Sequence, residues 1–280
     1  MDISTKKQTD KTGHAGKADW YVQAFNRQNY FDQYSTELSD ERTAKEVDFI
    51  ERAATLSKEY KILDVACGHG RHVNELARRG YDVWGVDIAP HAIEIAQKAA
   101  DELNIHPHLS VGDMKKLPYK NEEFDRVYNV FTSFGYFDKA EDEHAMLVEI
   151  HRVLKSGGIF LIDVLSLESE QKKFEALGKP DPDAPGWIII PTKIQILSGE
   201  ERKLTQWFDP ETHMLHTRRD WMEKGEPAMH ESFLHLFGRQ ELEGMLKKAG
   251  LEPTLTVGNY DGTPHNTDNS RTIITAEKKS

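Results

Sequence analysis

Short apolar runs alternate with helix-like spacing of apolar residues over positions 62–165. The runs have the length of buried strands, and they cover 62–65, 83–86, 109–111, 124–131 and 159–165, the last one preceded by a turn at Gly157-Gly158. Between them, apolar residues recur every three or four positions, in the sets Val73/Leu76/Ala77, Ala92/Ala96/Ala99/Leu103 and Leu147/Ile150/Leu154. Strands that alternate with helices form a parallel sheet covered on both faces. This pattern predicts an α/β fold.

The pattern changes after the fifth run. Residues 170–187 are rich in Lys, Glu, Pro and Asp, which favours a loop or a broken helix. Strand-like runs follow at 188–190, 203–208, 214–222 and 229–236, with turn residues at 209–212 and 224–227. We therefore predict an antiparallel β insertion over 166–236. A helix at 239–249 ending at Gly250, and runs at 255–258 and 272–276, complete the main sheet.

The N-terminal part divides into three stretches. Residues 1–17 are polar and without periodicity, which predicts a disordered tail. Residues 20–34 contain six aromatic side chains, and these favour either a helix packed on the domain or a flap over a ligand. A further helix is expected from Ser39-Asp40 to about Leu56. The core domain is then 18–165 together with 237–280, with an N-terminal cap helix.

Bulk composition restricts the class of partner. The net charge is −11, from 36 basic and 47 acidic residues, which disfavours a nucleic-acid partner. The single cysteine, Cys67, rules out an internal disulfide framework and fits a reducing cytoplasm. The N-terminus lacks the apolar segment of a secretory signal, and no apolar run has the length of a membrane span. We expect a cytoplasmic protein.

Glycines and acids follow the ends of three successive predicted strands. Gly68 and Gly70 let the backbone turn tightly and approach a ligand, and the next helix offers unpaired N–H groups to an anion. Asp87, at the end of the second strand, is placed to accept the hydroxyls of a ribose. Asp113 follows the third strand, where it could accept from an adenine amino group. This combination predicts a nucleoside-binding site.

The spacing within the glycine loop argues against a dinucleotide. A dinucleotide fingerprint needs a glycine three residues after Gly70, and position 73 is Val. The chain has Asp-x-x-x-Gly-x-Gly instead, from Asp64 to Gly70. Together with GVDIAP (85–90), GDMKKLPY (112–119), FDRVYNVFTSFGYF (124–137) and LVEIHRVLKSGGIFLIDV (147–164), it resembles the class I S-adenosylmethionine-dependent methyltransferases.

The resemblance covers about 35–165 and 230–278, and it is weak over the insertion. It implies a Rossmann-like, seven-stranded, mostly parallel sheet with helices on both faces. Arg42-Thr43-Ala44 and NVFTSFGYF are similar to glycine N-methyltransferase-like and amino-sugar N-methyltransferase-like enzymes. The resemblance therefore implies a small-molecule branch of the family, with S-adenosylmethionine as methyl donor and S-adenosylhomocysteine as product.

The resemblance also implies site residues. Cofactor contacts are expected from Arg42, Asp64, Ala66, Gly68, Gly70, Asp87, Ile88, Asp113, Met114 and Asn129. Arg42 matches an arginine that pairs with the cofactor carboxylate in glycine N-methyltransferase-like members. We expect His69 and Arg71 to be surface residues at the start of a helix, and Cys67 to pack in the loop. No cluster of His, Cys and Asp has metal-ligand spacing, so no metal is expected.

The acceptor zone is predicted from aromatic and histidine residues. Its candidates are Tyr21, Tyr30, Tyr34, Phe134 and Tyr136 as pocket walls, and His230 and His235 in the insertion as bases. An amine acceptor is favoured, because of the likeness around NVFTSFGYF, and an O- or C-acceptor on a natural product is the alternative. Nucleic-acid methylation is disfavoured, because residues 129–132 are Asn-Val-Phe-Thr and not Asn/Asp-Pro-Pro-aromatic. A non-catalytic cofactor-binding protein, and an insertion acting as lid or homodimer contact, stay open.

Overall fold

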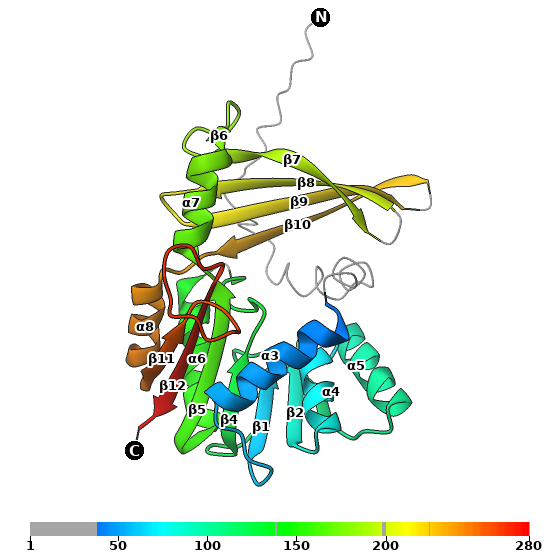
Figure 1. Cartoon of the computed structure of the whole chain (residues 1–280), viewed down its shortest axis with the longest axis vertical. Helices are drawn as coiled ribbons and strands as arrows, with labels where there is room; N and C mark the ends of the chain where they lie inside the picture. Colours follow the sequence, from blue (N-terminus) through cyan, green and yellow to red (C-terminus); the bar gives the residue numbers. More distant parts are fainter. Residues whose placement is uncertain (1–37, 138, 198–199, 224, 280) are drawn as a thin grey trace, which may run out of the picture.

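The computed structural model describes residues 38–137, 139–197, 200–223 and 225–279 (Figure 1). The larger of two sheets has seven strands in the order β11-β12-β5-β4-β1-β2-β3. Their bounds are β1 Lys61–Val65, β2 Asp82–Asp87, β3 His108–Val111, β4 Phe124–Asn129, β5 Leu154–Leu165, β11 Leu251–Val257 and β12 Arg271–Lys278. Neighbours among β1 to β5 pair in parallel, whereas β12 pairs antiparallel with both β5 and β11. The predicted seven-stranded, mostly parallel sheet is confirmed.

Helices cover both faces of this sheet. Helices α3 (Asp40–Ala53), α4 (Arg71–Arg78) and α5 (Pro90–Glu102) lie on one face, and α6 (Ala140–Val153) and α8 (Arg239–Lys248) lie on the other. Alternation along each strand supplies both cores. In β1, Ile62 packs in the core with α3 and α4, while Leu63 and Val65 pack in the core with α6 and α8.

A second sheet stands at one end of the first (Figure 1). Its five strands have the order β10-β9-β8-β7-β6, with bounds β6 Lys179–Pro180, β7 Ile188–Leu197, β8 Glu200–Asp209, β9 Met214–Glu223 and β10 Glu226–His235. Helix α7 (Leu167–Leu177) packs against it, with the rings of Phe174 and Phe208 5.2 Å apart. The strands pair antiparallel, as the sequence predicted for this stretch.

Two local predictions were wrong, and a third, the loop or broken helix over 170–187, was right only after Leu177, where helix α7 ends. Residues 167–177 form a regular helix, because Ser166 caps its first turn and Leu167 and Phe174, seven residues apart, both face the core. The Gly157-Gly158 pair lies inside β5, where the β4–β5 pairing shifts register. Leu103 is exposed, because the buried stripe of α5 is Ala92, Ala96 and Ala100.

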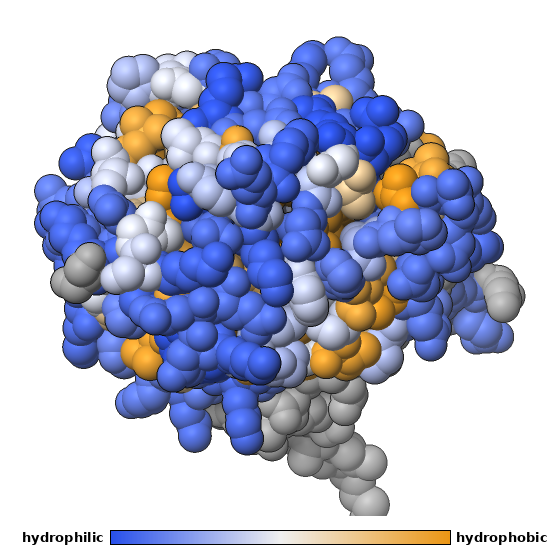
Figure 2. All heavy atoms as spheres, turned by 90° about the horizontal axis from the view of Figure 1, so that it is seen from below, coloured by the Kyte–Doolittle hydropathy of each residue, from blue (hydrophilic) through white to orange (hydrophobic). Residues whose placement is uncertain are grey.

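None of the helices described is both long enough and apolar enough to cross a membrane. Seen from below, the surface is mostly polar, and its apolar residues lie in several separate patches (Figure 2). The predicted tail (1–17) and the aromatic stretch with Tyr21, Tyr30 and Tyr34 fall outside the described residues.

Candidate functional site

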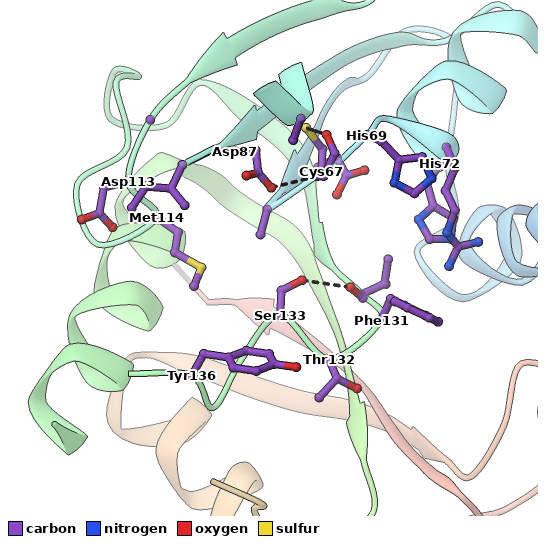
Figure 3. A pocket seen from close by; sticks show the side chains of 18 of the residues that line it. Cys67, His69, His72, Asp87, Asp113, Met114, Phe131, Thr132, Ser133 and Tyr136 are labelled. Atoms are coloured by element: carbon purple, nitrogen blue, oxygen red, sulfur yellow. Dashed lines mark hydrogen bonds between the residues drawn. The ribbon is translucent and has the colours of Figure 1, made fainter. Parts of the chain in front are cut away.

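A pocket opens at the carboxyl ends of β1, β2, β3 and β4 (Figure 3). Four loops supply most of its wall: residues 66–69 after β1, 87–88 at the end of β2, 112–114 after β3 and 130–133 after β4. Asp87, Asp113 and Met114 gather on one side, and His69, His72 and Phe131 on the other. The ends of parallel strands in an open α/β sheet are the usual place for a ligand crevice.

The glycine loop is folded tightly against the end of β2. Ala66, Gly68 and Gly70 all have positive φ, at 59°, 56° and 82°. The N–H of Cys67 donates to the carbonyl of Val86 (3.0 Å), which joins the loop to the neighbouring strand. Gly68 and Gly70 differ in the space around them. A Cβ on Gly68 would enter open space, whereas a Cβ on Gly70 would lie 2.6 Å from the Cβ of Ala96.

Asp87 fixes this arrangement from the end of β2. Its Oδ2 accepts from the N–H of Gly68 (2.8 Å) and its Oδ1 from the N–H of Ala89 (2.9 Å). The residue is 8% exposed and lines the pocket. Burial raises the pKa of Asp87, although hydrogen bonds from Ala89 and Gly68 act in the opposite direction. Each carboxylate oxygen keeps a lone pair for a ligand hydroxyl.

Asp64 lies deeper, at the end of β1. It is buried, and its Oδ2 has no hydrogen-bond partner within the described part of the chain. Burial raises the pKa of Asp64 well above its ordinary value, and the neighbouring Tyr128 and Arg71 oppose that rise. Buried polar atoms usually have a hydrogen-bond partner, so this oxygen is a candidate contact for a ligand donor.

The β4–β5 side of the pocket is held in an unusual backbone conformation. Phe131 and Thr132 have φ of 64° and 59°, although neither is glycine. Asp163 stabilises both residues, because its Oδ2 accepts from the N–H of Phe131 (2.8 Å) and its carbonyl accepts from the N–H of Thr132 (3.0 Å). Arg271 donates to Thr132 Oγ1 (2.8 Å) and to Asp163 Oδ1 (2.6 Å), and Tyr260 donates to Asp163 Oδ2 (2.6 Å).

Arg71 and His69 are pocket residues, so the prediction that they lie on the surface was wrong. Both line the cavity, and the Arg71 side chain is only 10% exposed. Burial and the charge of Arg71 lower the pKa of His69 to about 4, so this imidazole is neutral at pH 7. Sequence reasoning also missed His72 and Glu46. The only signal for them was the Gly-Arg-His run that opens α4, and the pairing with Glu46 spans 26 residues.

The predicted cofactor residues divide into two groups. Those along the pocket are Asp64, Ala66, Gly68, Asp87, Ile88, Asp113 and Met114. The other three, Arg42, Gly70 and Asn129, are not among the lining residues. Arg42 donates through Nε to Glu46 (2.9 Å), Gly70 packs against α5, and Asn129 is fully buried and donates to the carbonyl of Val65 (2.7 Å).

The predicted acceptor residues are not all brought together. Tyr136 lines the pocket beside Phe137. Phe134 is fully buried in the core, with its ring 5.1 Å from that of Phe237. His230 is buried in the second sheet, and the ring of His235 lies 4.4 Å from that of Phe237 in a tilted arrangement; neither belongs to the pocket lining.

Comparisons with known proteins agree with this geometry. Residues 62–158 match the family model described as "Methyltransferase domain". YqeM of Bacillus subtilis, a methyltransferase by name, is 26% identical over 80% of this chain and 87% of its own. The sterol 4-C-methyltransferase strm-1 of Caenorhabditis elegans is 31% identical, over 38% of this chain and 31% of its own.

Solved structures share the fold. A Clostridium acetobutylicum S-adenosylmethionine-dependent methyltransferase superimposes with a TM-score of 0.73, at 17% identity, over 90% of this chain and 98% of its own. CalS10, an amino pentose methyltransferase of Micromonospora echinaspora solved with S-adenosylmethionine bound, gives 0.63 at 19% identity, over 90% and 98%. Residues 62–158 form a methyltransferase domain, and the chain has the fold of the S-adenosylmethionine-dependent methyltransferases. The matched stretch, 62–158, contains β2 to β4, all but the first residue of β1, and the four loops that supply most of the pocket wall.

Within the described ranges, the methyltransferase domain contains no group of side chains that could bind a metal ion. No three His, Cys, Asp or Glu side chains converge there in a way that could hold an ion. Its lone Cys67 is buried at the loop, and burial raises the pKa of the thiol well above its ordinary value. The thiol therefore stays protonated and packs as a small residue.

Proposed function

We propose that this methyltransferase transfers the methyl group of S-adenosylmethionine to an amine nitrogen of a small soluble molecule. The observation that carries the proposal is the pocket itself. It joins a hydroxyl-accepting Asp87, a glycine loop open to a ligand at Gly68, and an aromatic end at Tyr136 and Phe137.

The residues present fit the cofactor. Asp87 is suited to the ribose hydroxyls, because both its oxygens already face backbone donors and keep free lone pairs. Asp113 and Met114, which line the pocket after β3, would hold the adenine, and Ile88 would contact the nucleoside next to Asp87. The orphaned Oδ2 of Asp64 is suited to an ammonium group, because a buried acid lacking a partner gains from a cationic donor.

Residues outside the pocket lining keep this shape. Asn129 joins β4 to β1 below the loop, and Gly70 allows α4 to approach α5. Asp163 with Arg271 holds Phe131 and Thr132 in place. These side chains contribute by holding the pocket in shape. Rigid positioning of two reactants can lower the activation barrier of a direct displacement by about 7–11 kcal/mol in favourable cases.

When bound, the cofactor supplies a methyl group activated by its sulfonium. The chain binds it, excludes water with Phe131 and Phe137, and orients the acceptor. An amine must be neutral to attack, so a hydrogen-bond acceptor is useful beside it. Tyr136 is the acceptor-side residue that we place against the substrate, and the imidazole of His69, neutral at pH 7, lines the same pocket. His230 and His235 would act on an acceptor only indirectly, through the second sheet.

The second sheet is tied to the acceptor side of the pocket. The N–H of His235 donates to the carbonyl of Gly135 (2.8 Å), one residue before Tyr136. Gly135 has φ of 105°, and a Cβ there would lie 2.4 Å from the carbonyl oxygen of His235. We propose that residues 166–236 form an insertion that positions Tyr136. A role as lid or as homodimer contact is compatible with this placement.

The choice of nitrogen rests on likeness. CalS10 is named an amino pentose methyltransferase, and KedS8 of Streptoalloteichus, a sugar N-methyltransferase, gives a TM-score of 0.64. Carbon is the rival acceptor, because the relative from C. elegans is named a sterol 4-C-methyltransferase.

One experiment separates these readings. The protein is incubated with trideuteromethyl-labelled S-adenosylmethionine and a metabolite extract, and products that gain the label are found by mass spectrometry. We expect a labelled N-methyl product together with S-adenosylhomocysteine. A label on oxygen or carbon would refute the nitrogen assignment. If the protein binds S-adenosylhomocysteine tightly but forms none from the labelled donor, it is a binding protein and not an enzyme.

A further inference from the structure

An acid occupies a core position on helix α6. Met146, Leu147 and Ile150 form the buried stripe of this helix, and all three are fully buried. Glu143 lies three, four and seven residues before them, on the same side of the helix. It is 2% exposed, and neither carboxyl oxygen has a hydrogen-bond partner among the residues that the structure describes. Burying an unpartnered polar group costs stability, so stability does not explain an acid at this position.

Glu143 lies beside the aromatic end of the pocket. Helix α6 begins shortly after Phe137, which lines the pocket next to Tyr136. The backbone N–H of Phe137 lies near the carboxyl group of Glu143, outside hydrogen-bond geometry, and its dipole favours the charged form of the acid. Phe137 is 6% exposed and packs in the same core as Met146. Phe137 therefore connects Glu143 to the ligand space.

A cation acts on Glu143, but it is shared with two other acids. Lys115 faces Glu143 from the loop after β3, and Asp142 lies next to it on its own helix. The Nζ of Lys115 is 3.4 Å from Asp142 Oδ2 and 4.0 Å from Asp113 Oδ2. Burial raises the pKa of Glu143 to about 8. The backbone of Phe137 and the charge of Lys115 oppose this rise, while the charge of Asp142 adds to it. The carboxyl group is therefore mostly neutral at pH 7.

Ionisation of Glu143 would change the pocket wall. A buried carboxylate has to be compensated by a cation or by water. The Nζ of Lys115 lies 5.2 Å from the centre of the Phe137 ring, so a shift of Lys115 toward Glu143 would take it away from that ring. Admitting water would require Phe137 itself to move. The neutral acid therefore fits the closed wall, and the carboxylate favours an open one.

We propose that Glu143 is a positioning residue for the aromatic end of the pocket, where its neutral carboxyl group keeps Phe137 and Tyr136 in place against the ligand. The inference rests on the proposed function, which assigns that end of the pocket to the methyl acceptor. An amine reacts in its neutral form, so the chemistry of the acceptor alone gives a rate that rises with pH. Glu143 acts in the opposite direction, because the share of the neutral acid falls above about pH 8.

The test compares pH profiles of the wild type, Glu143→Gln, Glu143→Met and Glu141→Gln. Glutamine keeps the shape of the acid but does not ionise, and Glu143→Met removes the charge with an apolar side chain in case the buried amide prevents folding. Glu141→Gln is the matched control, because Glu141 lies in the same first turn of α6 and is exposed. Circular dichroism confirms that each variant is folded at every pH.

Two quantities are measured across this range of pH. One is the initial rate of label transfer from trideuteromethyl-labelled S-adenosylmethionine to a dilute metabolite extract. The other is the dissociation constant of S-adenosylhomocysteine, determined by calorimetry. Each is expressed as a ratio of variant to wild type at the same pH, so that ionisation of the acceptor and of the ligand cancels.

We expect the rate ratio of Glu143→Gln to wild type to rise about tenfold between pH 7 and pH 9, because the share of neutral Glu143 falls about tenfold over that interval when its pKa is about 8. Glu143→Met should show the same rise, and the ratio for Glu141→Gln should stay constant. If the wall also holds the cofactor, the affinity ratio for S-adenosylhomocysteine rises in parallel.

Two results overturn the inference. One is a constant ratio of both rate and affinity in the two Glu143 variants, which would leave Glu143 with a purely structural role. The other is an equal rise in Glu141→Gln. Failure of the proposed function looks different, because the wild type would then form no labelled product at any pH. The affinity ratio alone then decides the inference, which stands if that ratio rises and falls if it stays constant.

Discussion

The two glycines of the loop give the sharpest prediction, because they share a backbone conformation but differ in their surroundings. Both have positive φ, at 56° for Gly68 and 82° for Gly70, so alanine at either site meets the same strain of about 1–2 kcal/mol. Alanine also restricts the unfolded chain, which returns about 0.4–1 kcal/mol at each site. These two contributions cancel when the variants are compared.

What remains is the contact with α5. At Gly70 a Cβ would lie 2.6 Å from the Cβ and 3.2 Å from the Cα of Ala96, while at Gly68 nothing lies within 4 Å. Overpacking of this kind costs about 1–3 kcal/mol. Gly70→Ala should therefore unfold more easily than Gly68→Ala by about 1–3 kcal/mol, measured by urea denaturation with linear extrapolation.

A second substitution tests the cause. Ala96→Gly removes the Cβ that Gly70→Ala would strike, so the double variant should recover at least about 1 kcal/mol relative to the sum of the single changes. Affinity for S-adenosylhomocysteine should show the opposite order, since Gly68 lines the pocket and Gly70 does not. Equal destabilisation by the two alanines, or strict additivity with Ala96→Gly, would refute the packing argument.

Other predictions concern charge and ligand contacts. Asp163→Ala leaves Arg271 buried without its acid, and should lower the free energy of unfolding by about 3–5 kcal/mol in urea; a loss under 1 kcal/mol would contradict the clamp. Burial raises the pKa of Glu143, 2% exposed, to about 8. The folded state then holds that proton more tightly than the unfolded state, so stability should fall as pH rises from about 4.5 to about 8. In Glu143→Gln this fall should be smaller, seen in melting temperatures over that range, and parallel curves would speak against it. Asp87→Ala should weaken S-adenosylhomocysteine binding more than tenfold, about 1.4 kcal/mol, in calorimetry without unfolding the protein; unchanged affinity would remove the ribose assignment. Tyr136→Ala should reduce turnover more than cofactor affinity, and equal losses would place Tyr136 outside the acceptor pocket.

Much of the fold could be predicted from the sequence, because buried parallel strands and amphipathic helices each leave a periodic record. The alternating strands and helices of the main sheet, the acids at strand ends and the antiparallel second sheet all followed from such local patterns, while the seven-stranded arrangement was implied by the family resemblance. The misses have a physical cause. Helix α7 was not predicted, because only polar and charged residues separate its two buried residues, Leu167 and Phe174. Such a composition is typical of a loop.

The site was only partly predictable for a different reason. Residues 66–69 and Asp87 belong to a short local motif, and the motif places them together. The partners of Arg71 do not belong to such a motif, because Glu46 lies 25 positions earlier, on another helix. Pairings of that kind depend on how α3 crosses α4, and no periodicity in either helix specifies them.

The clamp on Phe131 and Thr132 also sets an order of events. Its two ends, Thr132 and Arg271, are 139 residues apart. Strand β12 inserts between β5 and β11, and it follows every other described strand along the chain. During synthesis, the glycine loop, Asp87 and Asp113 therefore emerge long before Arg271, which helps to shape the opposite wall of the pocket. A chain that ends after β5 would have the glycine loop but not the clamp on Phe131 and Thr132. Its ligand affinity should therefore be lower than that of the chain with the complete sheet.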